Sequence, residues 1–225
     1  MLMEQERKQI VKYSRLLLAR NLTRGTGGNI SIYDRKAGLV AITPSGVEYD
    51  VMGWEDVPVC TVSGEIVEGT LKPSSETGMH LAMYRAREDF SSVVHTHSTY
   101  ATVLACMHVA LPAVHYLIGF SGASEVPCTR YLPFGSEELA CEVGSTFSKM
   151  ATLKALLLGN HGFISGGASL DEAFSIAEEM EFVSEIYYRL VAAGRCELLD
   201  ENDMDEVMKR FRTYGQKQVL KRENA

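Results

Sequence analysis

The sequence lacks any apolar run that approaches the roughly 18 residues of a membrane-spanning helix. It also lacks a basic excess, since 22 Lys and Arg stand against 29 Asp and Glu for a net charge of −7, whereas nucleic-acid-binding domains usually carry a basic stripe. The first residues, Met1–Gln9, are charged and lack the apolar core of a signal peptide. These absences predict a cytoplasmic protein that binds neither membrane nor nucleic acid.

The cysteines are few, and their spacing shows no paired motif. The five of them are an odd number, and no two form a C-x-x-C motif. We therefore expect reduced thiols, mostly small core residues, and no thiolate metal site. Their positions are Cys60, Cys106, Cys128, Cys141 and Cys196.

Repeats, low-complexity tracts and linkers are absent as well. The chain has 225 residues and is 46% hydrophobic, which suits one globular domain over residues 1–225. No G-x-G-x-x-G follows the first expected strand, which argues against a dinucleotide-binding fold.

Apolar periodicity and hairpin signals predict an α+β or three-layer α/β/α domain, with an antiparallel or mixed sheet and helices on its faces. The expected helices are Glu4–Arg20, Thr77–Arg87, Thr99–His108, Ser136–Lys149, Asp171–Ala193 and a last one capped by Asp203 and ending near Tyr214. The expected strands are Asn29–Tyr33, Leu39–Thr43, Val57–Val62, Ile66–Glu68, Ser92–His97, Val126–Tyr131 and Ala155–Ser165.

Three histidines predict one transition-metal site. His95 and His97 end an apolar strand, and residues i and i+2 of a strand point to the same face. His161 lies in a glycine-flanked turn after another apolar run. Three imidazoles leave a coordination position open, as in catalytic zinc sites. The alternative for each is a surface or turn-capping histidine. His80, His108 and His115 are taken as structural.

Three loops, Gly25–Asn29, Thr43–Gly46 and Lys72–Glu76, combine hydroxyls with exposed backbone N–H groups. Ser74 and Ser75 stand at an expected helix N-terminus, where free N–H groups favour anions. Each loop alone could be a turn or cap, but together they indicate a phosphate site built from neutral donors. Glu76 either stabilises its own helix or places a carboxylate beside phosphate and metal, as resting ligand and then general base.

These motifs occur in an order that resembles the class II, zinc-dependent ketose-phosphate aldolases of the L-fuculose-1-phosphate aldolase and L-ribulose-5-phosphate 4-epimerase superfamily. The similarity spans nearly the whole chain, and its details are nearest to the L-fuculose-phosphate aldolase branch. The matching segments are Gly25–Ser31, Thr43–Gly46, Pro73–Glu76, His95–His97, Ala113–Tyr116, Pro127–Gly135, His161–Gly162 and Lys209–Gly215.

The resemblance implies a nine-stranded, mainly antiparallel sheet between helices and a homotetramer with active sites between subunits. It implies one Zn²⁺ per subunit on His95, His97 and His161, with Glu76 as fourth ligand and catalytic carboxylate. Tyr116 would donate a proton to the aldehyde oxygen, and Tyr214 would help close the site. The residues that would line the phosphate site are Thr26, Gly28, Asn29, Thr43, Ser45, Gly46, Ser74 and Ser75.

Three positions depart from the family pattern: Gly27 replaces an alanine, Thr77 an aromatic residue, and Asn160 a histidine before His161. The zinc ligands stay intact, but the sugar is left open. Manganese or cobalt could also bind three imidazoles. The residues expected nearest the aldehyde are Phe134, Phe211 and Tyr214.

The expected reaction cleaves a ketose 1-phosphate, first of all L-fuculose 1-phosphate, to dihydroxyacetone phosphate and an aldehyde, L-lactaldehyde, by enediolate stabilisation. The alternative is a 4-epimerase, but that branch has aspartate at the position of Glu76 and another shortly after Tyr116. An aldolase or dehydratase of 5-deoxyribulose or methylthioribulose 1-phosphate stays open, as does a non-catalytic metal- or phosphate-binding subunit. A metallohydrolase is disfavoured because no H-E-x-x-H motif is present.

Overall fold

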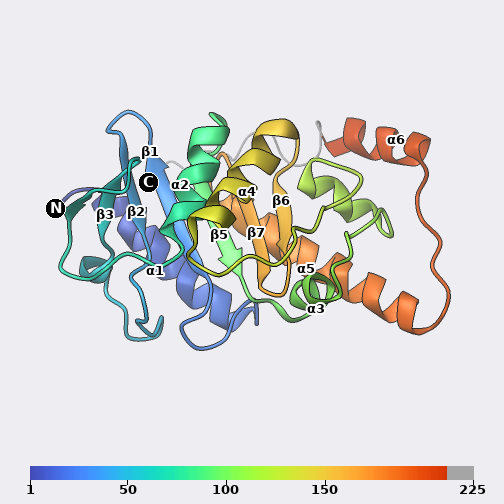
Figure 1. Ribbon diagram of the computed structural model, residues 1–225, viewed down its shortest axis with the longest axis horizontal. Helices are drawn as coiled ribbons and strands as arrows, with labels where there is room; N and C mark the ends of the chain where they lie inside the picture. The colour runs from blue at the N-terminus through green and yellow to red at the C-terminus, as the bar shows by residue number, and fades with distance from the viewer. Residues whose placement is uncertain (212–225) are drawn as a thin grey trace, which may run out of the picture.

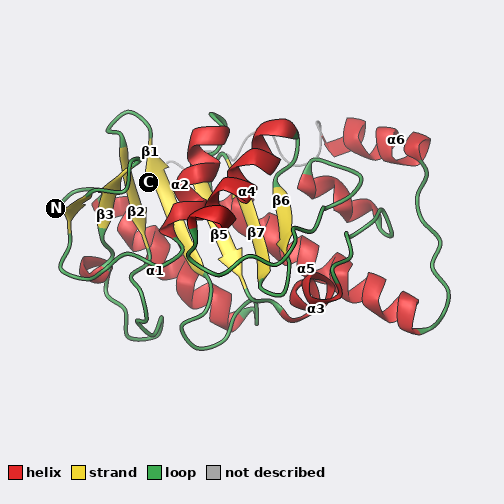
Figure 2. Ribbon diagram, in the orientation of Figure 1, coloured by secondary structure: helices red, strands yellow, loops and turns green. Residues whose placement is uncertain are grey.

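A computed structural model describes residues 1–211 of the chain. Figure 1 shows its elements in order along the chain, and Figure 2 separates helices from strands. The helices are α1 (Glu4–Ala19), α2 (Thr77–Ala86), α3 (Thr99–Met107), α4 (Glu137–Lys149), α5 (Leu170–Ala192) and α6 (Glu201–Phe211), with 3₁₀ helices η1 (Trp54–Asp56) and η2 (Tyr116–Ser121). The strands are β1 (Asn29–Asp34), β2 (Leu39–Ile42), β3 (Val59–Thr61), β4 (Ile66–Glu68), β5 (Ser92–Thr96), β6 (Ala155–Leu158) and β7 (Gly162–Gly167).

One sheet in the order β4-β3-β2-β1-β5-β7-β6 runs through the molecule, and every neighbouring pair is antiparallel (Figure 1). The expected fold class is confirmed, with seven strands in the described residues rather than nine. Within residues 1–211, no helix is long and apolar enough to cross a membrane.

Two hydrophobic clusters lie on opposite faces of the sheet. One packs α1, α3 and α5 against side chains such as Val94, and the other packs α2 and α4 against side chains such as Val93. Alternation along a strand therefore decides which helices each side chain meets. His95 is two residues beyond Val93, so it faces α2, the helix that begins next to Glu76.

Two expected strands need correction. Ala155–Ser165 is two strands, β6 and β7, joined by a turn in which Asn160 has a φ of 53°. Val126–Tyr131 forms only isolated bridges. In one of them the Leu157 N–H donates to the Pro127 carbonyl, and the Leu157 carbonyl accepts the Thr129 N–H. Proline has no N–H for a regular ladder, so the segment follows the edge of β6 without becoming a strand.

The last helix also differs from its expected start. Asp203 lies inside α6, and Asp200 precedes it. The Asp203 N–H donates to the Asp200 carboxylate over 2.8 Å, and the Asp200 N–H donates back to Asp203 over 3.3 Å. This reciprocal capping places the start of the helix at Glu201. The expected end near Tyr214, like Tyr214 itself, lies outside the described residues.

Candidate metal and phosphate site

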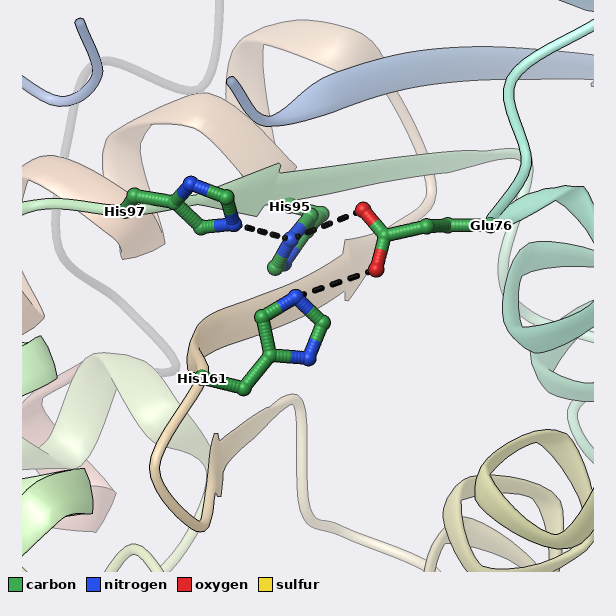
Figure 3. Close-up of side chains that lie close together, drawn as sticks. All are labelled: Glu76, His95, His97 and His161. Carbon is green, nitrogen blue, oxygen red and sulfur yellow. Dashed lines mark hydrogen bonds and ion pairs between the residues drawn. The ribbon is translucent and has the colours of Figure 1, made fainter. Parts of the chain in front are cut away.

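Four side chains meet at the ends of β5 and β7 and at the start of α2. Figure 3 shows Glu76, His95, His97 and His161 pointing toward one another. Their potential ligand atoms all lie within 4.8 Å of one another. Glu76 and His95 are buried, at 7% and 0% exposure. The four residues predicted as metal ligands are thus brought together.

The separations suit one ion. His95 Nε2 is 3.0 Å from His97 Nε2 and 3.2 Å from Glu76 Oε2, and His161 Nε2 is 3.0 Å from Glu76 Oε1. Four ligands at zinc bond lengths around a tetrahedral ion would lie ~3.4 Å apart. His95 Nδ1 donates to the Phe163 carbonyl over 2.8 Å, which leaves the Nε2 lone pair facing the cluster.

The protonation states also fit a cation. Burial alone raises the pKa of the Glu76 carboxyl, but the charges of His95 and His161 and hydrogen bonds from both outweigh it and hold that pKa well below its usual range. Desolvation, with His95 and His161 nearby, lowers the pKa of His97. The buried Glu76 Oε1 lies 3.0 Å from His161 Nε2 and has no other close polar contact assigned within residues 1–211. An ionised carboxylate and three imidazoles that converge on one point are a ligand set suited to a divalent metal.

A cavity of about 350 Å³ opens beside the cluster. It is within the usual size range of small-ligand sites. Its walls combine Glu76, His97 and His161 with loop residues, and Phe134, 71% exposed, lies at its edge. The loop residues that line it are Thr26, Gly27, Gly28, Asn29, Pro44, Ser45, Gly46, Ser74 and Ser75.

Backbone hydrogen bonds fix two of the three anion loops against each other. The Ser45 N–H donates to the Lys72 carbonyl over 2.9 Å, and the Ser74 N–H donates to the Thr43 carbonyl over 3.0 Å. Ser75 directly precedes Glu76, which occupies the N-cap position of α2, so this wall of the cavity lies at the N-terminus of the helix. Two segments about 30 residues apart in sequence therefore form one polar wall.

The glycine loop lies close behind the metal cluster. Gly28 has a φ of +70°, and a Cβ there would be 2.6 Å from the His95 carbonyl oxygen. The Tyr49 hydroxyl, 2% exposed, donates to the Gly28 carbonyl over 2.6 Å. Tyr49 thus holds this loop, although nothing in the sequence pattern marked it.

Among the described residues, the predicted site residues Thr43 and Tyr116 do not line the cavity, and neither does the fully buried metal-ligand candidate His95. Thr43 is 1% exposed, and its hydroxyl accepts the Ile30 N–H over 3.3 Å. Tyr116 begins η2, is 52% exposed and stacks on Phe211 of α6. Tyr214 lies beyond the described part of the chain.

The β6–β7 turn that carries His161 is anchored by residues taken as structural. His108 Nε2 and the Asn160 Oδ1 are 2.5 Å apart, and the Asn160 N–H donates to the Ala105 carbonyl over 3.1 Å. His108 and Asn160 both adopt left-handed backbone conformations. The pair ties the turn to the end of α3 and so sets the position of His161.

Comparison with known proteins settles the family. Residues 8–188 match the Class II Aldolase and Adducin N-terminal domain. The chain belongs to the class II aldolase family. A 5-deoxy-D-ribulose 1-phosphate aldolase of Bacillus thuringiensis serovar kurstaki is 47% identical over 216 residues, 96% of this chain and 100% of the relative. An L-fuculose phosphate aldolase of Haemophilus influenzae is 37% identical over 195 residues, 86% and 88% of the two chains.

A solved structure titled L-fuculose 1-phosphate aldolase has a TM-score of 0.89 and 38% identity, covering 94% of this class II aldolase and 98% of its own chain. The resemblance stated from the sequence motifs is therefore confirmed, and so is the enzyme class, an aldehyde-lyase. The metal-ligand and phosphate-binding roles of individual residues stay predictions.

Proposed function

We propose that this class II aldolase cleaves 5-deoxyribulose 1-phosphate between C3 and C4, giving dihydroxyacetone phosphate and acetaldehyde. The supporting observation is the cavity in which Glu76, His97 and His161, three members of the four-residue cluster with His95, face loops rich in neutral anion donors. Among the alternatives open from the sequence, this substrate is favoured by the 47% identity to a relative of that name, over its full length.

L-Fuculose 1-phosphate is the second candidate, favoured by the relative at 37% identity and the solved structure at 38%. Both sugars share the dihydroxyacetone phosphate half and end in a methyl group, but differ in the aldehyde. Phe134 at the cavity edge offers an apolar surface for that methyl group. One methyl or hydroxyl on such a surface discriminates by only ~1–3 kcal/mol, so both substrates should react at different rates.

The proposed cofactor is one Zn²⁺ per subunit, held by His95, His97 and His161, with Glu76 as fourth ligand at rest. A divalent ion bound there would supply Lewis acidity that stabilises enediolate charge. The histidines would direct their Nε2 atoms at one point, and the hydrogen bond from His95 Nδ1 to the Phe163 carbonyl fixes the orientation of the His95 ring.

Glu76 would carry the proton at carbon. In the direction of synthesis, its carboxylate removes a proton from the hydroxymethyl carbon of dihydroxyacetone phosphate, which becomes C3 of the sugar. The freed electron pair forms the C3–C4 bond to the aldehyde carbon, and the aldehyde oxygen takes a proton from an acid on the opposite side. Cleavage reverses these steps, so Glu76 then returns the proton to carbon.

The phosphate would be bound mainly by neutral donors from three loops and by the N-terminus of α2. Such an arrangement fixes the substrate at the end remote from the reacting carbons, so that binding energy serves orientation. The residues proposed to contact it are Thr26, Gly28, Asn29, Ser45, Gly46, Ser74 and Ser75. Thr43 would act through the backbone, since its hydroxyl is used within the protein.

The acid for the aldehyde oxygen would be Tyr116 of a neighbouring subunit in a homotetramer, with Tyr214 helping to close the site. The described cavity wall contains no tyrosine, and Tyr116 is exposed on a separate surface of its own subunit. We also propose a cytoplasmic location, which accords with five free cysteines in the described residues.

The test is a coupled assay for dihydroxyacetone phosphate over four ketose phosphates: 5-deoxyribulose, L-fuculose and methylthioribulose 1-phosphates and L-ribulose 5-phosphate. We expect release from the first at the highest kcat/KM, with acetaldehyde in equal amount. Conversion of ribulose 5-phosphate to xylulose 5-phosphate without free triose phosphate would instead establish an epimerase. Zinc binding without turnover on any of the four would establish a non-catalytic subunit.

A further inference from the structure

A buried chain of hydrogen bonds runs from the interior of the protein to Glu76. The Tyr84 hydroxyl is 2.7 Å from Ser31 Oγ, and Ser31 Oγ is 2.8 Å from His80 Nδ1. His80 Nε2 is 2.5 Å from Asn29 Oδ1, and Asn29 Nδ2 donates to Glu76 Oε2 over 2.9 Å. We call these five residues the Glu76 relay.

The relay forms where one face of α2 packs against one face of β1. Glu76, His80 and Tyr84 are four residues apart and share one face of α2. Asn29 and Ser31 are two apart on β1 and share the sheet face that α2 covers. All five side chains are at most 7% exposed. Because these side chains are almost wholly shielded from solvent, their polar atoms depend mainly on one another for hydrogen bonds.

The direction of every hydrogen bond follows from the carboxylate. Ionised Glu76 only accepts, so Asn29 must present its NH₂ group to it and its oxygen to His80. That oxygen also only accepts, so His80 must donate from Nε2. Burial, with the nearby charge of His95, lowers the pKa of His80 to about 3, so its ring is neutral and Nδ1 accepts from Ser31. Tyr84 then donates to Ser31.

We propose that His80 is a positioning residue of the aldolase, which acts through Asn29 to hold the catalytic carboxylate of Glu76. The His80 Nε2–H fixes which way the Asn29 amide faces, and the amide fixes Oε2. Glu76 Oε1, which Asn29 does not contact and which faces His161 Nε2 over 3.0 Å, is left as the oxygen that exchanges the proton with substrate. The second N–H of Asn29 stays available to the bound sugar phosphate.

This role rests on the proposed function, since it assigns His80 an effect on proton transfer by Glu76. A purely structural buried histidine would affect folding but would not be coupled to Asn29. The two can be separated because glutamine reproduces the Nε2–H donor and a distal acceptor, whereas phenylalanine keeps the ring shape and removes both groups.

The test compares His80→Phe, His80→Gln and Tyr84→Phe with wild type, each loaded with zinc. We expect His80→Phe to lower kcat by ~10–100-fold with zinc content and KM little changed, the size of effect seen when a supporting hydrogen bond is lost. His80→Gln should restore most of kcat. Tyr84→Phe should stay within about threefold of wild type, because Ser31 can still donate to His80.

Coupling is measured by adding His80→Phe to Asn29→Ala. If His80 acts through Asn29, the double variant has the kcat of Asn29→Ala alone, whereas independent effects multiply. Multiplying effects, or equal kcat for His80→Phe and wild type, would overturn the proposal.

A second measurement does not depend on activity. In ¹⁵N-histidine-labelled protein at pH 7, the His80 resonances, assigned by their loss in His80→Gln, should show a neutral ring protonated at Nε2. A ring protonated at Nδ1, or at both nitrogens, overturns the relay even if every substrate assay succeeds. An inactive wild type with the expected ring would refute the proposed function alone. If His80→Phe does not fold, this measurement still decides.

Discussion

At Glu76 two demands meet in one carboxylate. As the proposed base it would have to be ionised to accept a proton from carbon, and it lies among three imidazoles in a position 7% exposed to solvent. Burial would favour the protonated form, yet the histidines outweigh burial and keep the pKa low. A bound divalent ion would also stabilise the ionised carboxylate. The proposed base is then ready to accept a proton, but its lowered pKa makes it a weaker base.

Glu76→Gln should separate these demands. The amide keeps the size of the side chain but cannot take a proton, so we expect retained zinc and a kcat lower by ~10²–10⁴-fold. Zinc is measured by elemental analysis and kcat by dihydroxyacetone phosphate release. Glu125→Gln, at an exposed position, is the matched control and should be unchanged. Near-wild-type turnover in Glu76→Gln would remove this residue from the mechanism.

His80 gives a prediction for stability against pH. Its pKa is 6.5 when unfolded and about 3 when folded. Below pH 6.5 the His80 side chain binds a proton in the unfolded chain but not in the folded one. The free energy of unfolding therefore falls as pH falls from 7 toward 3. Metal-stripped wild type should therefore lose about 2 kcal/mol relative to His80→Gln between pH 7 and pH 5.

Denaturant unfolding of both proteins at the two pH values measures this difference. A constant gap between wild type and His80→Gln would mean that His80 is protonated in the folded state, which the relay does not allow.

At the scale of elements, the sequence was most informative where one pattern acts alone. The i, i+2 spacing of His95 and His97 predicted a shared face because a strand has only two faces. The apolar pattern of Ala155–Ser165 predicts one strand because both β6 and β7 are apolar, although the glycines around His161 already indicate a turn within it. The turn was encoded in the left-handed conformation of Asn160.

The Glu76 relay shows a contact that sequence patterns do not predict. Glu76, His80 and Tyr84 at four-residue spacing, with Asn29 and Ser31 two apart, were visible as two separate patterns. Their meeting depends on the packing of α2 over β1, a contact between segments far apart in the chain. Sequence alone therefore identified Glu76 at one end of the network and Asn29 beside it, and left His80 among structural residues.

Gly28 tests how the glycine loop supports β5. Gly28→Ala should destabilise the protein by ~1–3 kcal/mol more than Gly38→Ala. The two glycines have φ values of +70° and +69°, so an alanine at either position would suffer the same backbone strain. Only at Gly28 does a Cβ meet the His95 carbonyl, since nothing lies within 4 Å at Gly38. Thermal unfolding at equal protein concentration measures both, and equal losses would show that the loop can move away from β5.

At the scale of the whole molecule, one subunit presents its groups on separate surfaces. The cavity contains the base and the anion loops, whereas Tyr116 is exposed beside α6. Figure 1 shows α6 at the end of the molecule away from the arrowhead of β5. A cyclic assembly would bring the tyrosine surface of one copy to the cavity of the next, because a heterologous interface pairs different surfaces.

Mixing inactive variants tests this arrangement. Glu76→Gln and Tyr116→Phe should each have little activity, but subunit exchange in an equal mixture should restore about a quarter of wild-type activity. In a ring, one site in four then receives Glu76 from one variant and Tyr116 from the other. The unexchanged mixture is the control. No recovery, with exchange shown by mass spectrometry, would place the proton donor within the same subunit.

The central claim is that His95, His97, His161 and Glu76 hold one metal ion that the aldol cleavage requires. The most direct measurement is titration of Zn²⁺ into metal-stripped protein while dihydroxyacetone phosphate release from 5-deoxyribulose 1-phosphate is followed. The account predicts no release without metal, and a rise that breaks at one equivalent per subunit. Full turnover by the metal-free protein, or a break at another stoichiometry, would contradict it.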